Sequence, residues 1–224
     1  QLADFVREHG PWDYVIHNAG LTKTLDKRNF YRINAQNTAN LIEALAASGC
    51  KPEKFLLMSS LSSYGRGDEK TFRPISLDDP QLPDTDYGKS KLAGEELFFE
   101  YGKECGAKVL VYRFPNLFGK WCRPNYNSAV ATFCNNIAND LPIQVNDPRV
   151  ELELLYIDDL IDEMIHALKG EEHRCEFEGL DVHPLVDGRY CYCPVTHKVT
   201  LGEIVDLLHQ FAEMPKTLMI PEIP

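Results

Sequence analysis

The sequence predicts an α/β fold built on a doubly wound, largely parallel sheet. Short apolar strands alternate with segments of helical periodicity over most of the chain. Polar residues follow the ends of three of these strands, namely Asn18, Ser60 and Asn116. Because the carboxyl ends of parallel strands share one edge of a sheet, these side chains should gather there, where ligands of such sheets bind. With 224 residues, 44% of them hydrophobic, the chain can form one large domain or two small ones.

The first half supplies most of the alternation. A short helix at 1–9 is closed by Gly10-Pro11. The predicted elements after it are a strand at 13–17, a helix at 28–48 stopped by Gly49, a strand at 55–58, a helix from Tyr87 to about Cys105 and a strand at 108–113. Residues 66–86 are rich in proline and aspartate and are predicted to be a loop.

The second half has a looser pattern. It predicts a helix at 127–140, a strand at 150–156, and helices at 158–168 and 200–211. Residues 170–198 read as a loop-rich segment. A domain boundary is expected at 114/115, with residues 115–224 forming a smaller mixed region interleaved with the last elements of the sheet.

The start of the chain is abrupt. A doubly wound nucleotide-binding sheet normally opens with a strand, a glycine-rich turn and a helix that holds the pyrophosphate. No G-x-x-G-x-x-G occurs in this sequence. We therefore expect a fragment that lacks about two strand–helix units, each of about 30 residues.

Charge and composition exclude some classes of binding partner. The net charge of -11 and a pI of about 5.1 argue against nucleic acid or an anionic membrane, which both require clustered positive charge. No apolar run has the length of a membrane span, and the first residues show no signal pattern. Seven cysteines in an odd, irregular set favour reduced thiols and a cytoplasmic location.

The segment Tyr87-Gly-Lys-Ser-Lys91 carries acid–base chemistry. Its phenol and its second ammonium are four residues apart, so a helix places them on one face, one turn apart. A lysine beside a tyrosine favours the phenolate and can bring a pKa near 10 towards working pH. Such a pair can move a proton on or off a hydroxyl or carbonyl oxygen. Alone, this spacing is weak evidence for an acid–base site, and further matching residues are needed to support it.

Four motifs follow one another along the chain, and their order matters as much as their residues. They are His17-Asn-Ala-Gly20, Ser59-Ser60 before Tyr64, the segment at 87–91, and Arg113-Phe-Pro-Asn-Leu-Phe-Gly119. Over residues 1 to about 170 this set resembles the extended short-chain dehydrogenase/reductases, the NAD-dependent epimerase/dehydratase family. The resemblance implies a Rossmann-like fold and assigns residues 1–114 to the remainder of an NAD(P)-binding domain. Residues 115–224 would bind the substrate.

The resemblance also implies a role for each matched residue. Tyr87 would be the acid/base, Lys91 would bind the nicotinamide ribose and lower the tyrosine pKa, and Ser60 would hydrogen-bond the substrate oxygen. The other residues assigned to the cofactor, NADP or NAD, are Asn18, Ala19, Gly20, Ser59 and Pro115. Those assigned to the substrate are Ser62, Asn116, Arg123 and Arg149. Asn34 matches an asparagine that is commonly structural.

Some assignments keep alternatives. Ser60 could instead satisfy a strand end, and Ser59 or Ser62 could take its role. Many epimerases place an arginine before a Tyr-Ile-Asp-Asp motif to hold the diphosphate, but residues 151–155 read Glu-Leu-Glu-Leu-Leu. Arg149, Arg123 or Lys120 could replace it, since a planar guanidinium suits a diphosphate. For Arg149, a solvated surface charge is an equal alternative.

The function implied is reduction of a UDP-4-keto-6-deoxy-(amino)sugar with NAD(P)H. The motifs at 114–133, 143–147, 156–159 and 199–208 resemble reductases of capsular-polysaccharide precursor synthesis. Two alternatives remain: a redox-neutral nucleotide-sugar epimerase or dehydratase, and a non-catalytic NAD(P)-binding protein of the same fold. Related enzymes imply a homodimer through the helices at 28–48 and 87–105.

The histidines and cysteines between 173 and 197 include residue types that bind zinc. Their spacing fits no common structural zinc site, so we expect incidental thiols and no bound metal.

Overall fold

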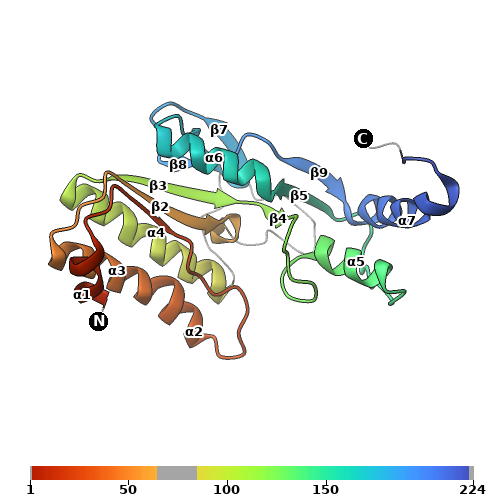
Figure 1. The fold of residues 1–224 in the computed structure, drawn as a ribbon, viewed down its shortest axis with the longest axis horizontal. Coiled ribbons are helices and arrows are strands. Elements are labelled where there is room, and N and C mark those ends of the chain that lie inside the picture. Colours follow the sequence, from red (N-terminus) through yellow and green to blue (C-terminus); the bar gives the residue numbers. More distant parts are fainter. Residues whose placement is uncertain (1, 65–84, 222–224) are drawn as a thin grey trace. The chain divides into compact units, whose positions relative to one another are not determined.

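The computed structural model describes residues 2–64 and 85–221, drawn as coloured ribbon in Figure 1. The predicted loop at 66–86 therefore lies outside the described residues except for its last two positions. The chain forms two compact units. Unit 1 comprises residues 1–114 and 163–192, and unit 2 comprises residues 115–162 and 193–224.

Unit 1 contains a six-stranded sheet in the order β1-β2-β3-β8-β6-β7. The strands are β1 (Tyr14–His17), β2 (Lys54–Ser60), β3 (Lys108–Phe114), β8 (Tyr190–Cys191), β6 (Arg174–Glu178) and β7 (Asp181–Pro184). The pairs β1·β2, β2·β3 and β3·β8 are parallel, whereas β6 is antiparallel to both its neighbours. The predicted α/β fold with a largely parallel sheet is confirmed.

Helices cover both faces of this sheet because side chains alternate along each strand. Along β3, Arg113 contacts α4 (Asp86–Cys105), and Tyr112 donates a hydrogen bond to Glu163 of α6 (Ile157–Lys169) at 2.7 Å. The other helices of this unit are α1 (Leu2–His9), α2 (Arg28–Phe30), the π-helical η1 (Tyr31–Gln36), α3 (Asn37–Ser48) and the 3-10 turn η2 (Leu61–Tyr64). In Figure 1, α3 and α4 run along the same side of β2 and β3.

The predicted helix at 28–48 is continuous, but it passes through three geometries, α2, η1 and α3. It ends as predicted at Gly49, whose left-handed φ of 68° closes the helix. In the core of unit 1, aromatic side chains of α4 pack against β2. The Phe55 ring lies 4.2 Å from that of Phe98 and meets Tyr101 edge-on at 5.7 Å.

Unit 2 has its own three-stranded sheet and core. Its strands are β4 (Asn116–Phe118), β5 (Glu151–Tyr156) and β9 (His197–Thr200), in the order β4-β5-β9. The helices α5 (Ala129–Ala138) and α7 (Leu201–Thr217) contribute Phe133 and Ile204, which pack with Leu154. A capping box between Thr200 and Glu203 starts α7.

The segment at 170–198, predicted to be loop-rich, also contains strands that its sequence pattern does not predict. This segment contains the hairpin β6–β7, the short strand β8 and the start of β9. Charged and histidine residues interrupt its apolar pattern, so the strands form through pairing with distant partners. Cys191, for example, pairs with Tyr112 of β3. The strand β4 was missed because it is three residues long and follows a proline.

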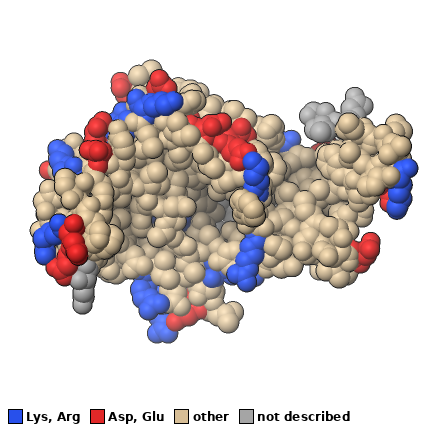
Figure 2. Space-filling model, in the orientation of Figure 1, with Lys and Arg blue, Asp and Glu red and all other residues tan. Residues whose placement is uncertain are grey.

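Surface charges of opposite sign often lie side by side. On the face in Figure 2, blue and red residues adjoin one another around much of unit 1. The pairs Arg28–Asp26 and Arg189–Glu96 are exposed examples, at 2.9 and 3.0 Å. Exposed pairs of this kind contribute little to stability, because water and salt screen the two charges. Among the described residues, no helix is long and apolar enough to cross a membrane.

Candidate active site

The carboxyl ends of β1 and β2 bring predicted site residues to one edge of the unit 1 sheet. Ser60 is the last residue of β2 and pairs in register with Phe114, the last residue of β3. Asn18, Ala19 and Gly20 follow the end of β1 directly, and all three are exposed. The parallel register therefore gives the predicted clustering for the strands of this unit.

Tyr87 lies in the first turn of α4, next to this edge. Thr85 caps the helix by accepting a hydrogen bond from the Gly88 amide at 3.0 Å. The Tyr87 ring packs edge-on against Phe30 at 5.8 Å. Burial raises the pKa of the Tyr87 phenol, and a hydrogen bond with the Ser60 side chain acts in the opposite direction. Ser60 and Tyr87, far apart in sequence, therefore lie together at this edge of the sheet.

Lys91 lies one turn further along α4, and its Nζ donates to the Met58 carbonyl oxygen at 2.7 Å. A Cβ built on Gly20 would be 3.5 Å from this Nζ, so the ammonium faces the loop after β1. Burial lowers the pKa of Lys91 to about 8, while the charge of Glu95 raises it. The ammonium can thus lose its proton near working pH.

The direction of the tyrosine pKa differs from the sequence prediction. A neighbouring ammonium was expected to lower it, but in the structure burial dominates and raises it. The Lys91 ammonium instead lies at the end of β2, bound to the Met58 carbonyl. The phenol is consequently a protonated group that can donate its proton, with Ser60 holding the same oxygen.

Asn34 ties the loop after β1 to α4. Its Oδ1 accepts from the Leu21 amide at 2.7 Å, and its Nδ2 donates to the Leu21 carbonyl and to Ser90 Oγ, both at 3.0 Å. Asn34 is buried in the π-helical segment. It therefore fixes the loop that contains Asn18 and Gly20 relative to the helix that carries Tyr87.

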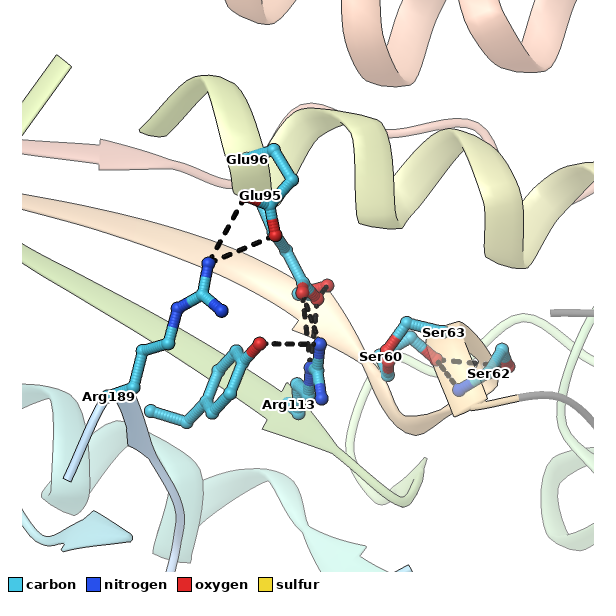
Figure 3. Close-up of polar contacts among 9 residues, drawn as sticks. Ser60, Ser62, Ser63, Glu95, Glu96, Arg113 and Arg189 are labelled. Atoms are coloured by element: carbon cyan, nitrogen blue, oxygen red, sulfur yellow. Dashed lines mark hydrogen bonds and ion pairs between the residues drawn. The ribbon is translucent and has the colours of Figure 1, made fainter. Parts of the chain in front are cut away.

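The serines that flank Ser60 point in different directions. Ser59 is buried and donates to Glu95 Oε1 at 2.5 Å, on the opposite face of the strand from Ser60. Ser62 accepts a hydrogen bond from the Ser60 hydroxyl at 3.1 Å. Ser62 is therefore the neighbour that shares the surroundings of Ser60 (Figure 3).

The remaining predicted residues belong to unit 2. Asn116 opens β4, and its amide donates to the Glu153 carbonyl at 3.2 Å. Arg149 is 85% exposed and forms an ion pair with Asp147 at 2.9 Å, the arrangement of a solvated surface charge. Three further residues of this unit are Pro115, Arg123, whose guanidinium lies 5.7 Å from the Tyr126 ring, and Lys120, paired with Asp158 at 2.5 Å.

The buried pair Glu95–Arg113 was missed in the sequence. Both side chains are 0% exposed, with Nη2 and Oε2 2.5 Å apart. Two signals could have revealed the pair. Glu95 follows Lys91 by four residues and so shares its helix face, and Arg113 is a charge within an otherwise apolar strand.

The histidines and cysteines of 173–197 do not converge. Cys175 and Cys191 are buried in β6 and β8, and His173 Nδ1 contacts Glu163 at 2.6 Å. All seven cysteines are thiols. Within the described ranges, no group of three or more His, Cys, Asp or Glu residues is arranged to hold a metal ion.

The largely parallel sheet, with Ser60, Tyr87 and Lys91 at its carboxyl edge, has the arrangement of an α/β protein that binds a ligand beyond its strand ends. A model of the NAD dependent epimerase/dehydratase family matches residues 1–176. The chain belongs to this family, which confirms the resemblance seen in the sequence motifs.

Individual proteins are also similar to this chain in sequence and structure. The chain is 32% identical over 206 residues to a UDP-2-acetamido-2,6-beta-L-arabino-hexul-4-ose reductase of Pseudomonas aeruginosa, covering 92% of this chain and 47% of that protein. The crystal structure of the capsular polysaccharide assembling protein CapF from Staphylococcus aureus is similar with a TM-score of 0.71 and 36% identity, over 99% of this chain and 51% of that one.

A UDP-glucuronic acid 4-epimerase from Bacillus cereus, solved with UDP-glucuronic acid and NAD, shares the fold at 21% identity, with a TM-score of 0.72 over 95% of this chain and 62% of that one. The chain spans about half the length of the reductase and CapF.

Proposed function

We propose that this chain carries the acid–base part of a nucleotide-sugar oxidoreductase, which reduces a UDP-4-keto-6-deoxy-(amino)sugar with NAD(P)H. The observation that carries the proposal is the meeting of Ser60 and Tyr87 at the end of β2, with Lys91 one turn along α4. The similarity to the Pseudomonas reductase and to CapF supports the substrate class.

The donor set at the strand ends fits a dinucleotide. An ammonium has three N–H donors, and the Met58 carbonyl takes one from Lys91. The others suit ribose hydroxyls. Gly20 faces Lys91 without a side chain, so the backbone after β1 leaves room for a ligand beside the ammonium. Lys91 and the loop at Asn18–Gly20 would hold NAD(P)H, which when bound supplies the hydride for the sugar carbonyl carbon.

The chain's own residues would handle the proton. As the C4 carbonyl carbon accepts the hydride, its oxygen becomes basic and takes the proton from the Tyr87 hydroxyl. The C=O bond becomes CH–OH, and the resulting tyrosinate regains a proton from solvent. Ser60 would orient the carbonyl oxygen through a second hydrogen bond once its hydroxyl, which donates to Ser62 here, turns to the substrate. The raised pKa of Tyr87 favours a proton donor, as reduction requires.

Replacing the phenol tests the proposal in the complete protein. Tyr87→Phe should lower turnover of the keto sugar about 100- to 10,000-fold, the contribution typical of an acid–base group. Tyr14→Phe makes the same chemical change at an exposed position of β1 and should leave turnover unchanged. Oxidation of NADPH, followed by absorbance, measures the rate. Full activity in Tyr87→Phe would refute the site, and sugar interconversion without net NADPH oxidation would show an epimerase.

A further inference from the structure

Glu95 extends the face of α4 that carries the proposed catalytic pair. Tyr87, Lys91 and Glu95 are spaced by four residues each, so they lie above one another on one face of the helix. Glu95 has no exposed surface. The proposed reaction makes no direct use of this buried carboxylate, which lies one turn beyond Lys91.

The carboxylate of Glu95 is held on both oxygens. Arg113 Nε donates to Oε1 at 3.1 Å, and Arg113 Nη2 donates to Oε2 at 2.5 Å. Ser59 Oγ donates to Oε1 at 2.5 Å. The guanidinium also donates to the Tyr190 hydroxyl at 3.0 Å and stacks on its ring at 3.9 Å. Figure 3 shows Glu95 pointing from the helix towards Arg113.

Two consequences follow for the site. The bond from Ser59 ties α4 to β2 one residue before Ser60, so it fixes the strand end that meets Tyr87. The negative charge of Glu95 also favours the ammonium form of Lys91 against the cost of burial. The first effect concerns Ser60, which hydrogen-bonds the phenol, and the second concerns Lys91, one turn further along α4.

None of the other titratable groups named near Lys91, which are His17, Tyr87 and Arg113, carries a negative charge, whereas Glu95 does. His17 faces Lys91 from β1 and is neutral above about pH 4, because burial and the Lys91 charge lower its pKa. Tyr87 is on the same helix face, and burial keeps its phenol protonated. The Arg113 charge, on β3, is bound to Glu95 itself. Among the described charged side chains that act on Lys91, Glu95 is the one that favours its charged form.

We propose that Glu95 is a positioning residue of the active site: through Ser59 it sets the end of β2 against α4, and its carboxylate, one helical turn beyond Lys91, is the counter-charge of that ammonium. This inference rests on the proposed function for its catalytic consequence, although its electrostatic part can be measured without turnover.

The test is Glu95→Gln, which keeps the shape and removes the charge. Titration of Lys91, followed by NMR of carbon-labelled lysines and assigned with Lys91→Arg, should show a pKa lower than that of the parent protein. In the complete protein, the basic limb of the kcat–pH profile should move to lower pH. At pH 8 we expect kcat to fall about 10-fold while KM stays within about twofold, a partial loss of acid–base catalysis.

Glu96→Gln is the matched control. It removes the same charge one residue along, from an exposed carboxylate that pairs with Arg189 (Figure 3). The Lys91 titration and the kcat–pH profile should both match the parent. A purely structural role of Glu95 would lower stability and leave both curves in place, and that result would overturn the proposal.

Glu95→Gln leaves the Arg113 charge buried, which could prevent folding. The variant Glu95→Gln/Arg113→Gln removes both charges and should lower the Lys91 pKa by less than Glu95→Gln does, because a nearby cation is lost as well. An unchanged Lys91 titration in the folded variant would refute the electrostatic role. A lowered Lys91 pKa in a protein that never oxidises NADPH with a keto sugar would instead refute the proposed function and leave this coupling intact.

Discussion

His17 ends β1 with its ring stacked on Phe98 at 5.8 Å and its Nε2 2.9 Å from Thr38 Oγ1. The imidazole is 7% exposed. Burial, with a smaller contribution from the Lys91 charge, lowers its pKa from 6.5 to about 4. Such a site accepts the neutral ring and resists the imidazolium, so proton binding and folding are coupled.

The first prediction is a pH-dependent stability from His17. Because its folded pKa is below its unfolded pKa, the unfolded state binds more protons between about pH 4 and 6.5. The contribution is fully present above pH 6.5 and is lost as the pH falls to 4, by about 3 kcal/mol. Urea unfolding across this range should show a flatter slope for His17→Gln. His209→Gln, an exposed position on α7, should keep the parental slope; equal slopes in all three proteins would contradict the assignment.

At the scale of elements, the approach of α4 to η1 depends on Gly94. A Cβ built at this position would lie 2.8 Å from the Asn34 carbonyl oxygen, which is shorter than a real contact allows. The partner is backbone and cannot turn away. The same Asn34 holds the loop after β1 through its side chain. A shift of the two helices would therefore displace the loop relative to Tyr87.

Gly94→Ala should lower stability, although alanine favours a helix by about 1 kcal/mol over glycine. Forced separation of packed elements costs typically about 1–3 kcal/mol, so after the helix gain of about 1 kcal/mol we expect a net loss of up to about 2 kcal/mol in urea unfolding. Lys103→Ala on the exposed side of α4 is the control and should change stability by less than about 0.5 kcal/mol. A gain in stability for Gly94→Ala would show that the helices have room to move.

The elements that the sequence predicts are those whose signals are local. The strand at 55–58 is an apolar run, and the helix at 28–48 ends at a glycine, so each carries its boundary within a few residues. In contrast, β8 has two residues and exists because it pairs with β3 and β6. Likewise, the spacing of Tyr87 and Lys91 is visible along the chain, whereas the Arg113–Glu95 bond spans a strand and a helix.

For the whole molecule, each of the two units has a hydrophobic cluster of its own among the described residues. In unit 1 the core is centred on β2, β3 and α4, with Phe55, Phe98 and Val111 buried. In unit 2 it is formed by Phe133, Leu154 and Ile204. The proposed acid–base residues are all in unit 1, whereas Asn116, Arg123 and Arg149 are in unit 2. Each group of residues thus depends on the stability of its own core.

The last prediction is that core mutations act within their own unit. Ile204→Val removes one buried methyl group from unit 2 at a cost of about 1 kcal/mol, or about fivefold in the population of open states. Amides of β5 and α7 should then exchange hydrogen about fivefold faster, while those of β2 and β3 keep the parental rate. The reciprocal variant Val111→Ala should accelerate exchange in β2 and β3 and spare β5 and α7. Equal acceleration in both units from either variant would show that the two cores unfold as one cooperative structure.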